Sequence, residues 1–123
     1  MSPLKITRQD RAAGPVLHVT GELDYDQAAA LREETERLPL RPGQCLVIDL
    51  AGLEFCDSTG ITALLAARQH AQAAGAEVAL AAVPANTLRI LTLVGLHQVF
   101  TLLPDAGADT GAGGGTGGDA GTA

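Results

Sequence analysis

Aromatic residues and lysine are scarce in this chain of 123 residues. It has no Trp, one Tyr and two Phe, and its single lysine is Lys5. Proteins that bind nucleic acids neutralise phosphates with clusters of Lys and Arg and stack bases on aromatic rings. The formal net charge of −6, without any run of basic residues, would repel a phosphate backbone. The sequence therefore argues against a nucleic-acid partner.

Clustered metal ligands and long apolar runs are missing as well. Cys45 and Cys56 are the two cysteines, and the three histidines are scattered. A tetrahedral metal site needs ligands at short spacing, so we expect two small buried thiols and neither metal nor cofactor. No apolar run approaches the roughly 18 residues of a membrane helix, and the N-terminus lacks a signal-peptide pattern. We expect a cytoplasmic protein without a membrane partner.

Glycine, by contrast, is concentrated near the C-terminus. Residues 104–123 hold eight Gly and five Ala, and no Lys or Arg. Such a segment cannot bury enough apolar surface to offset the entropy lost on ordering. We expect one folded domain over residues 1–103 and a disordered tail over residues 104–123.

The remaining chain alternates between strand patterns and helix patterns. Short runs rich in Val, Leu and Ile indicate strands, and apolar residues at a 3.6-residue period indicate helices. Strands are expected at residues 4–8, 15–21, 45–50, 76–83 and 99–103. Helices are expected from Asp24 or Asp26 to Leu38, at residues 59–74 and at residues 87–94. The order β-β-α-β-α-β-α-β predicts an α/β fold, with a small mixed sheet flanked by helices.

A loop over residues 51–57 is expected to lead from the apolar strand at 45–50 to the longest helix. The helix begins with Asp57-Ser58-Thr59-Gly60. Either Asp57 or Ser58 can be the N-cap, whose side-chain oxygen accepts a backbone N–H, and Gly60 allows close packing in the first turn. The same helix end suits a phosphate, because free N–H groups and the helix dipole attract anions there. Ser58 is thus a candidate for a cap, for a phosphorylation site, or for both.

A catalytic role for this serine finds little support. The nucleophile elbow needs Gly two residues before the serine, where this chain has Cys56. Only His70 and His97 follow Ser58 in the sequence, and His70 is expected in the middle of a helix. The P-loop motif of phosphate-binding enzymes is absent too. We predict a binding protein rather than an enzyme, with a small serine hydrolase as the alternative from another class.

Three sets of residues together form a family pattern. They are Gly21-Glu22-Leu23-Asp24, then Val47-Ile48-Asp49-Leu50 with Phe55-Cys56-Asp57-Ser58-Thr59-Gly60, and finally Gly95-Leu96 with Val99-Phe100. With these motifs, residues 4–103 resemble the STAS-domain anti-sigma factor antagonists of bacteria. The resemblance implies that the unphosphorylated protein binds a partner that is both an anti-sigma factor and a serine kinase, and so frees a sigma factor.

The resemblance also implies roles for individual residues. Phosphorylation of Ser58 would abolish binding, and a phosphoserine phosphatase would restore the active form. Thr59 is a second hydroxyl, but the modified residue of the family follows Asp, which favours Ser58. Asp24 matches an acidic residue close to the phosphorylated serine. The alternative within this fold is a STAS scaffold or transport-system subunit that is never phosphorylated.

The expected partner-binding surface combines the serine motif with the last helix. The helix at residues 87–94 has more apolar residues than one buried face can hold, so some should be exposed or covered by a partner. The residues expected at the interface are Asp24, Asp57, Ser58, Thr59, Gly60, Leu88 and Leu93.

Overall fold

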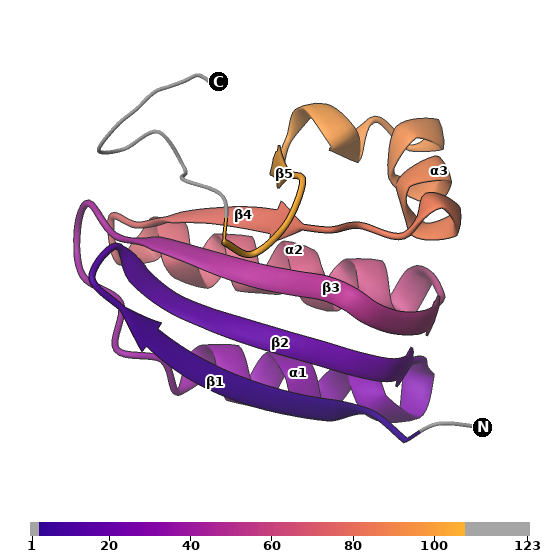
Figure 1. The fold of residues 1–123 in the computed structure, drawn as a ribbon, viewed down its shortest axis with the longest axis horizontal. Helices are drawn as coiled ribbons and strands as arrows, with labels where there is room; N and C mark the ends of the chain where they lie inside the picture. Colours follow the sequence, from indigo (N-terminus) through magenta and orange to yellow (C-terminus); the bar gives the residue numbers. More distant parts are fainter. Residues whose placement is uncertain (1–2, 108–123) are drawn as a thin grey trace.

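The computed structural model describes residues 3–107, which form one five-stranded sheet with helices (Figure 1). The strands are β1 (Lys5–Arg11), β2 (Gly14–Leu23), β3 (Cys45–Cys56), β4 (Glu77–Ala81) and β5 (Thr101–Leu103). The helices are α1 (Tyr25–Glu36), α2 (Ser58–Ala73), α3 (Ala85–Leu93) and the short 3₁₀ helix η1 (Leu96–Gln98). The expected α/β fold and its order of elements are confirmed, with η1 as an addition.

The strand order in the sheet is β1-β2-β3-β4-β5. A tight hairpin joins β1 to β2 in antiparallel fashion, whereas β2, β3, β4 and β5 pair in parallel. The parallel strands β2, β3 and β4 therefore end at the same edge of the sheet, and each is followed by a helix. This topology brings three helix N-termini to one edge, although they are far apart in the sequence.

The main core lies between the sheet and the helices α1 and α2, which cover one of its faces (Figure 1). Both helices turn small or branched side chains toward the sheet, which lets them pack closely. Those buried from α1 are Ala28, Leu31 and Thr35, and those from α2 are Gly60, Ile61, Ala63, Leu64, Ala67 and Ala71. The two helices also pack against each other.

A smaller apolar cluster lies on the opposite face of the sheet. Its buried members are Val16, Cys45, Val47, Ala79 and Ala81, and Leu103 and Ala106 pack against them. Arg11 fixes the chain after β5 to this face, because its Nη1 donates a hydrogen bond to the carbonyl oxygen of Ala106 at 2.6 Å. Residues 104–107 of the expected tail are thus placed on the sheet, and residues 108–123 lie outside the described residues.

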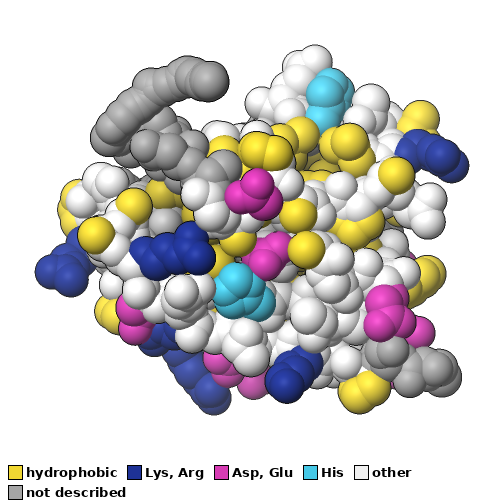
Figure 2. Space-filling view, viewed as in Figure 1, with side chains coloured by type: hydrophobic (Ala, Val, Ile, Leu, Met, Phe, Trp, Pro, Cys, Tyr) yellow, Lys and Arg dark blue, Asp and Glu magenta, His cyan; other side chains and the backbone are white. Residues whose placement is uncertain are grey.

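Polar side chains occupy the centre of this opposite face (Figure 2). His18 Nδ1 lies 2.7 Å from Asp49 Oδ2, and His18 Nε2 lies 3.2 Å from Gln9 Oε1. The other carboxylate oxygen of Asp49 accepts the backbone N–H of Ala51 at 3.0 Å. Asp49 therefore holds both the histidine of β2 and the backbone of β3, which indicates a structural role for this pair.

Several expected boundaries differ from the structure, and two of these differences have an identifiable cause. The segment from Ala51 to Cys56, expected as part of a loop, continues strand β3. It pairs with a longer β2 across register shifts between His18 and Thr20 and between Gly21 and Glu22. Such bulges interrupt the strict alternation of buried and exposed residues, so the pattern of a strand is lost. At the C-terminal end, the expected strand at 99–103 contracts to Thr101–Leu103, because the chain first turns through η1.

Candidate functional site

The site is built where β2 and β3 end next to each other. Leu23 and Cys56 are register partners at the ends of these strands, and Asp57 N donates to the Leu23 carbonyl oxygen at 3.4 Å. The next residues, Asp24 and Asp57, are the N-caps of α1 and α2. Parallel pairing therefore sets two capping aspartates and two helix N-termini side by side.

Asp57 is the cap of α2, and the expectation that Ser58 also acts as a cap is wrong. Asp57 Oδ1 accepts hydrogen bonds from Thr59 N at 3.0 Å and from Gly60 N at 3.1 Å. Its backbone is extended, with φ −103° and ψ −171°, as an N-cap residue requires. Ser58 is already the first residue of the helix, and the side chain that accepts the free N–H groups is that of Asp57.

Hydrogen bonds stabilise the ionised form of Asp57. The Thr59 hydroxyl makes the largest contribution, and the N–H groups of Gly60, Thr59 and Tyr25 add to it. Together they hold the pKa of the Asp57 carboxyl below its ordinary value, although desolvation acts in the opposite direction. A carboxylate at a helix N-terminus is further favoured by the helix dipole. Asp57 therefore carries a negative charge next to Ser58 at neutral pH.

The two hydroxyls of the motif have different surroundings. Ser58 is exposed, and no described residue hydrogen-bonds to its hydroxyl. Thr59 is half-buried, and its hydroxyl donates to Asp57 Oδ1 at 2.5 Å. One turn further on, Thr62 Oγ1 donates to the Ser58 carbonyl oxygen at 3.0 Å and ties down the backbone of the first turn. An approaching enzyme can reach the hydroxyl of Ser58, whereas that of Thr59 is engaged within the protein.

Gly60 lies beneath these residues and is buried. A Cβ atom at this position would stand 2.7 Å from the Leu23 carbonyl oxygen and 2.7 Å from Cys56 Sγ. These distances are too short for any side chain, so only glycine lets the first turn of α2 approach the strand ends. Gly60 was expected among the partner-contacting residues, but its burial means that it positions the motif rather than forming its surface.

Asp24 faces the same edge from α1. Its Oδ1 accepts the N–H of Gln27 at 3.1 Å, and the side chain is partly buried. Asp26 follows in the first turn of α1 and is exposed. With Asp57, these two residues make the edge around Ser58 acidic, and we refer to Asp24, Asp26 and Asp57 as the acidic edge.

Leu88 and Leu93 lie on α3, which follows β4 at the same end of the sheet (Figure 1). The exposed fraction is 36% for Leu88 and 79% for Leu93. Leu91 anchors this helix in the core with no exposed surface, and α3 packs mainly on η1. Figure 2 shows hydrophobic side chains gathered over this part of the molecule. The expected apolar excess of α3 is therefore present at the surface.

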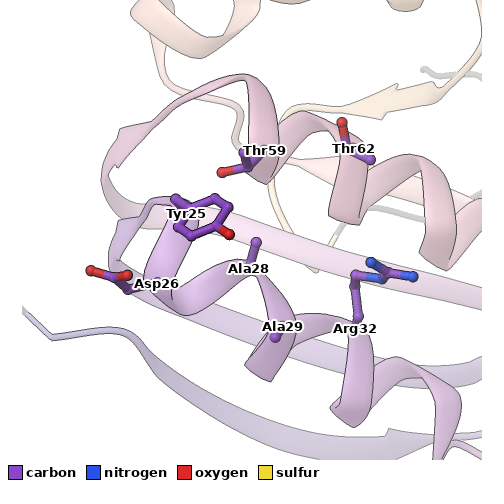
Figure 3. A pocket seen from close by; sticks show the side chains of 7 residues that line it. All are labelled: Tyr25, Asp26, Ala28, Ala29, Arg32, Thr59 and Thr62. Carbon is purple, nitrogen blue, oxygen red and sulfur yellow. The ribbon is translucent and has the colours of Figure 1, made fainter.

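A groove runs between α1 and α2 next to the serine motif (Figure 3). It has a volume of about 460 Å³ and is lined by Tyr25, Asp26, Ala28, Ala29, Arg32, Thr59 and Thr62. Neither Tyr25 nor Arg32 is among the residues expected at the interface from the sequence. Their spacing of seven residues, with alanines at the third and fourth positions between them, places them on one face of the helix.

The histidine on the same helix as Ser58 lies far from the serine. His70 lies on the same helix, twelve residues or about 18 Å further along, and is 3.4 Å from the Leu38 carbonyl oxygen. Among residues 3–107, no group of three or more His, Cys, Asp or Glu side chains could hold a metal ion. Over the same residues, no helix is long and apolar enough to cross a membrane.

Comparison with known families identifies the domain. The family model described as "Mlab, STAS domain" matches residues 6–104. The chain belongs to the STAS domain family. The curated relatives include the anti-sigma-F factor antagonist RsfB of Mycobacterium tuberculosis. It is 33% identical over 99 residues, which make up 80% of this chain and 80% of RsfB. A STAS-domain containing protein of Pseudomonas aeruginosa is 27% identical over 70% of this STAS chain and 84% of its own.

Solved structures agree with this assignment. An anti-sigma factor antagonist from Mycobacterium paratuberculosis superposes with a TM-score of 0.71 at 28% identity, over 85% of this chain and 88% of the other. The anti-sigma factor antagonist SpoIIAA in its unphosphorylated form superposes with a TM-score of 0.61 at 16% identity, over 85% and 89% of the two chains. The latter similarity shows the fold alone. The expected resemblance to STAS domains is therefore confirmed.

Proposed function

We propose that this protein is an anti-sigma factor antagonist controlled by phosphorylation of Ser58. Its unphosphorylated form binds an anti-sigma factor that is also a serine kinase, and a sigma factor is thereby released in the cytoplasm. Phosphorylation of Ser58 ends this binding, and a phosphoserine phosphatase reverses it. The proposal is supported by the relatives named anti-sigma factor antagonists, one of which is 33% identical over most of both chains.

The observation that carries the choice of residue is the contrast between the two hydroxyls. Ser58 is exposed at the first position of α2, whereas the Thr59 hydroxyl donates to Asp57 Oδ1. A kinase must reach the oxygen that it phosphorylates, and phosphorylation of Thr59 would break a hydrogen bond that supports the helix cap. Both considerations favour Ser58 over Thr59.

The electrostatics of the site explain how the phosphate could act as a switch. A phosphoserine carries about −1.5 to −2 charges at pH 7. The domain itself tolerates this charge, because the N-terminus of α2 favours anions. A partner that fits the acidic edge already meets Asp24 and Asp57, and the phosphate adds charge and bulk at the same place. A loss of about 3–4 kcal/mol would weaken the complex roughly 200- to 1,000-fold.

The same surroundings support a role in binding rather than in catalysis. Ser58 has no histidine within reach on its helix, because the only one there, His70, lies about 18 Å away. A fluorophosphonate probe labels activated serines, so we expect it to leave Ser58 unlabelled. Labelling of Ser58 would instead favour a serine hydrolase.

Phosphosite mapping and binding measurements test the proposal. The kinase for this test is an anti-sigma factor that is recovered with the protein by affinity purification. With this kinase and ATP, we expect one phosphate on Ser58 of the wild-type protein and none on Ser58→Ala. Thr59→Val is the matched control, because it removes the neighbouring hydroxyl and should leave phosphorylation of Ser58 in place.

Calorimetry with the same kinase and ADP should then give tight binding for the wild type and a loss of at least 100-fold for Ser58→Asp or the phosphorylated protein. A phosphate mapped to another residue, or unchanged binding after phosphorylation, would overturn the proposal. A protein that is never phosphorylated would point to a STAS scaffold or a transport-system subunit.

A further inference from the structure

The groove between α1 and α2 combines two exposed side chains that have no role in the fold. Tyr25 is the only tyrosine of the chain, and its side chain is 76% exposed. Arg32 is exposed, and its guanidinium makes no hydrogen bond or ion pair with any described residue. Tyr and Arg are the residue types in which binding energy concentrates at protein interfaces. Their presence along one groove indicates a surface that binds a partner.

The groove also differs in charge from the surface next to it. The acidic edge of Asp24, Asp26 and Asp57 lies at the N-termini of α1 and α2, where Ser58 also lies, and Asp26 lines the groove as well. Arg32 is the only cation that lines the groove, one turn beyond the alanines Ala28 and Ala29. In Figure 3 the carboxylate of Asp26 points away from the other labelled side chains, whereas Arg32 points toward α2. A partner that covers both areas must be basic over the edge and acidic over the groove.

A single partner would cover both areas. Thr59 and Thr62 line the groove on the α2 side, and Thr62 is hydrogen-bonded to the carbonyl oxygen of Ser58. The groove therefore begins within one helical turn of the proposed phosphorylation site. An interface of ordinary size buries roughly 800 Å² on each partner, far more than the serine motif alone can offer. A kinase bound at Ser58 would extend over the groove.

From these observations we propose that the α1–α2 groove receives an acidic side chain of the anti-sigma factor, which pairs with Arg32 while Tyr25 packs over an apolar neighbour. This inference rests on the function proposed above and adds a determinant of partner choice to it. The small alanines on the groove floor leave room for an inserted side chain. Charge of opposite sign at the two ends of the surface fixes the orientation of the partner and disfavours kinases without the matching acid.

Calorimetry with the purified anti-sigma factor tests this inference. We expect Arg32→Gln to weaken binding about 10- to 100-fold and Tyr25→Ala about 10-fold. The matched control is Arg37→Gln, which removes the same charge from an exposed arginine at the C-cap of α1. This arginine is paired with Glu34 rather than facing the groove, so its loss should change the affinity less than twofold.

A charge reversal distinguishes direct pairing from a structural effect. Arg32→Glu should lose more affinity than Arg32→Gln. Substitution of the matching acid of the partner by Lys should raise the affinity for Arg32→Glu at least tenfold. Arg32 is exposed, so these variants should keep the stability of the wild type in thermal unfolding, which is measured alongside.

The outcomes separate this inference from the proposed function. If wild-type protein binds and Ser58→Asp does not, but Arg32→Gln and Arg37→Gln bind equally well, the groove is not part of the interface. If Arg32→Gln changes the binding affinity of the phosphorylated protein alone, the inference is also overturned, because Arg32 would then act on the phosphate. If the wild type itself does not bind, the proposed function fails first.

Discussion

Gly60 lies where the structure leaves no room for a side chain, and replacing it with alanine tests this close packing. The added Cβ would stand 2.7 Å from the Leu23 carbonyl oxygen, 2.7 Å from Cys56 Sγ and 2.9 Å from Leu23 Cγ. The carbonyl oxygen belongs to the backbone at the end of β2 and cannot rotate away. The first turn of α2 must therefore move outward to admit the methyl group.

Two opposing effects decide the stability of Gly60→Ala. Alanine in place of glycine favours a helix by about 0.5–1 kcal/mol. Overpacking in a close-packed region costs about 1–3 kcal/mol, and a contact with fixed backbone belongs in the upper half of that range. The cost of overpacking therefore exceeds the gain in helix propensity, and we expect the free energy of unfolding to fall by about 1–2 kcal/mol. For a domain of this size, the midpoint of thermal unfolding should fall by about 5–10 °C.

Denaturant unfolding followed by circular dichroism measures this loss. The pair Gln69→Ala and Gln69→Gly gives the helix-propensity difference at an exposed position of the same helix, without any clash. Subtracting that difference isolates the packing cost at Gly60. A Gly60→Ala protein as stable as the wild type, or more stable, would refute the reasoning. Because the displaced turn carries Ser58, we also expect slower phosphorylation of the variant.

Three further predictions concern the cap of α2, the two cysteines and the packing of α3. Asp57→Ala should lose about 1–2 kcal/mol at pH 7, whereas Asp57→Asn, which can still cap the helix, should lose much less. Because the folded protein lowers the pKa of Asp57, the part of its advantage over Asp57→Ala that depends on ionisation should be complete above about pH 4. That part should be lost as the pH falls through the lowered pKa, which leaves the stability near that of Asp57→Asn; denaturant unfolding against pH measures it. Burial raises the pKa of the Cys45 and Cys56 thiols to about 11, so at pH 8 both should react with iodoacetamide about 100-fold more slowly than in the unfolded protein, as mass spectrometry would show. Leu91→Ala should cost about 2–5 kcal/mol, whereas Leu93→Ala, at a side chain that is 79% exposed, should change the free energy of unfolding by less than about 0.5 kcal/mol; equal losses for the two would contradict the packing of α3.

Much of the fold was accessible from local patterns, and the exceptions have identifiable causes. The long amphipathic helices and apolar strands follow from periodicity, which depends only on neighbouring residues. The extension of β3 from Ala51 to Cys56 could not be predicted from periodicity, because a bulge against β2 breaks the alternation of buried and exposed side chains. The short strand after Gly95 was overestimated, because the left-handed conformation of this glycine, with φ +81°, starts a 3₁₀ turn first.

The candidate site divides in the same way. The sequence placed a serine at the start of a helix, but Asp57 and Ser58 are equally good caps by composition. Only the geometry, with an extended Asp57 and two N–H groups within reach of its Oδ1, assigned the cap to the aspartate and left Ser58 exposed. Leu88 and Leu93 remain predicted partner contacts, and the tail beyond residue 107 remains a prediction.

The sequence by itself determined the elements, their order and the residue types at each helix start, because these depend on contacts within a few residues along the chain. The tertiary structure decided which of these features meet. Parallel pairing of β2 with β3 brought Asp24 next to Asp57, although thirty-three positions separate them. The packing of α1 on α2 then created the groove between Tyr25 and Arg32. Such proximity arises from the register and close packing of distant segments, which no local pattern records.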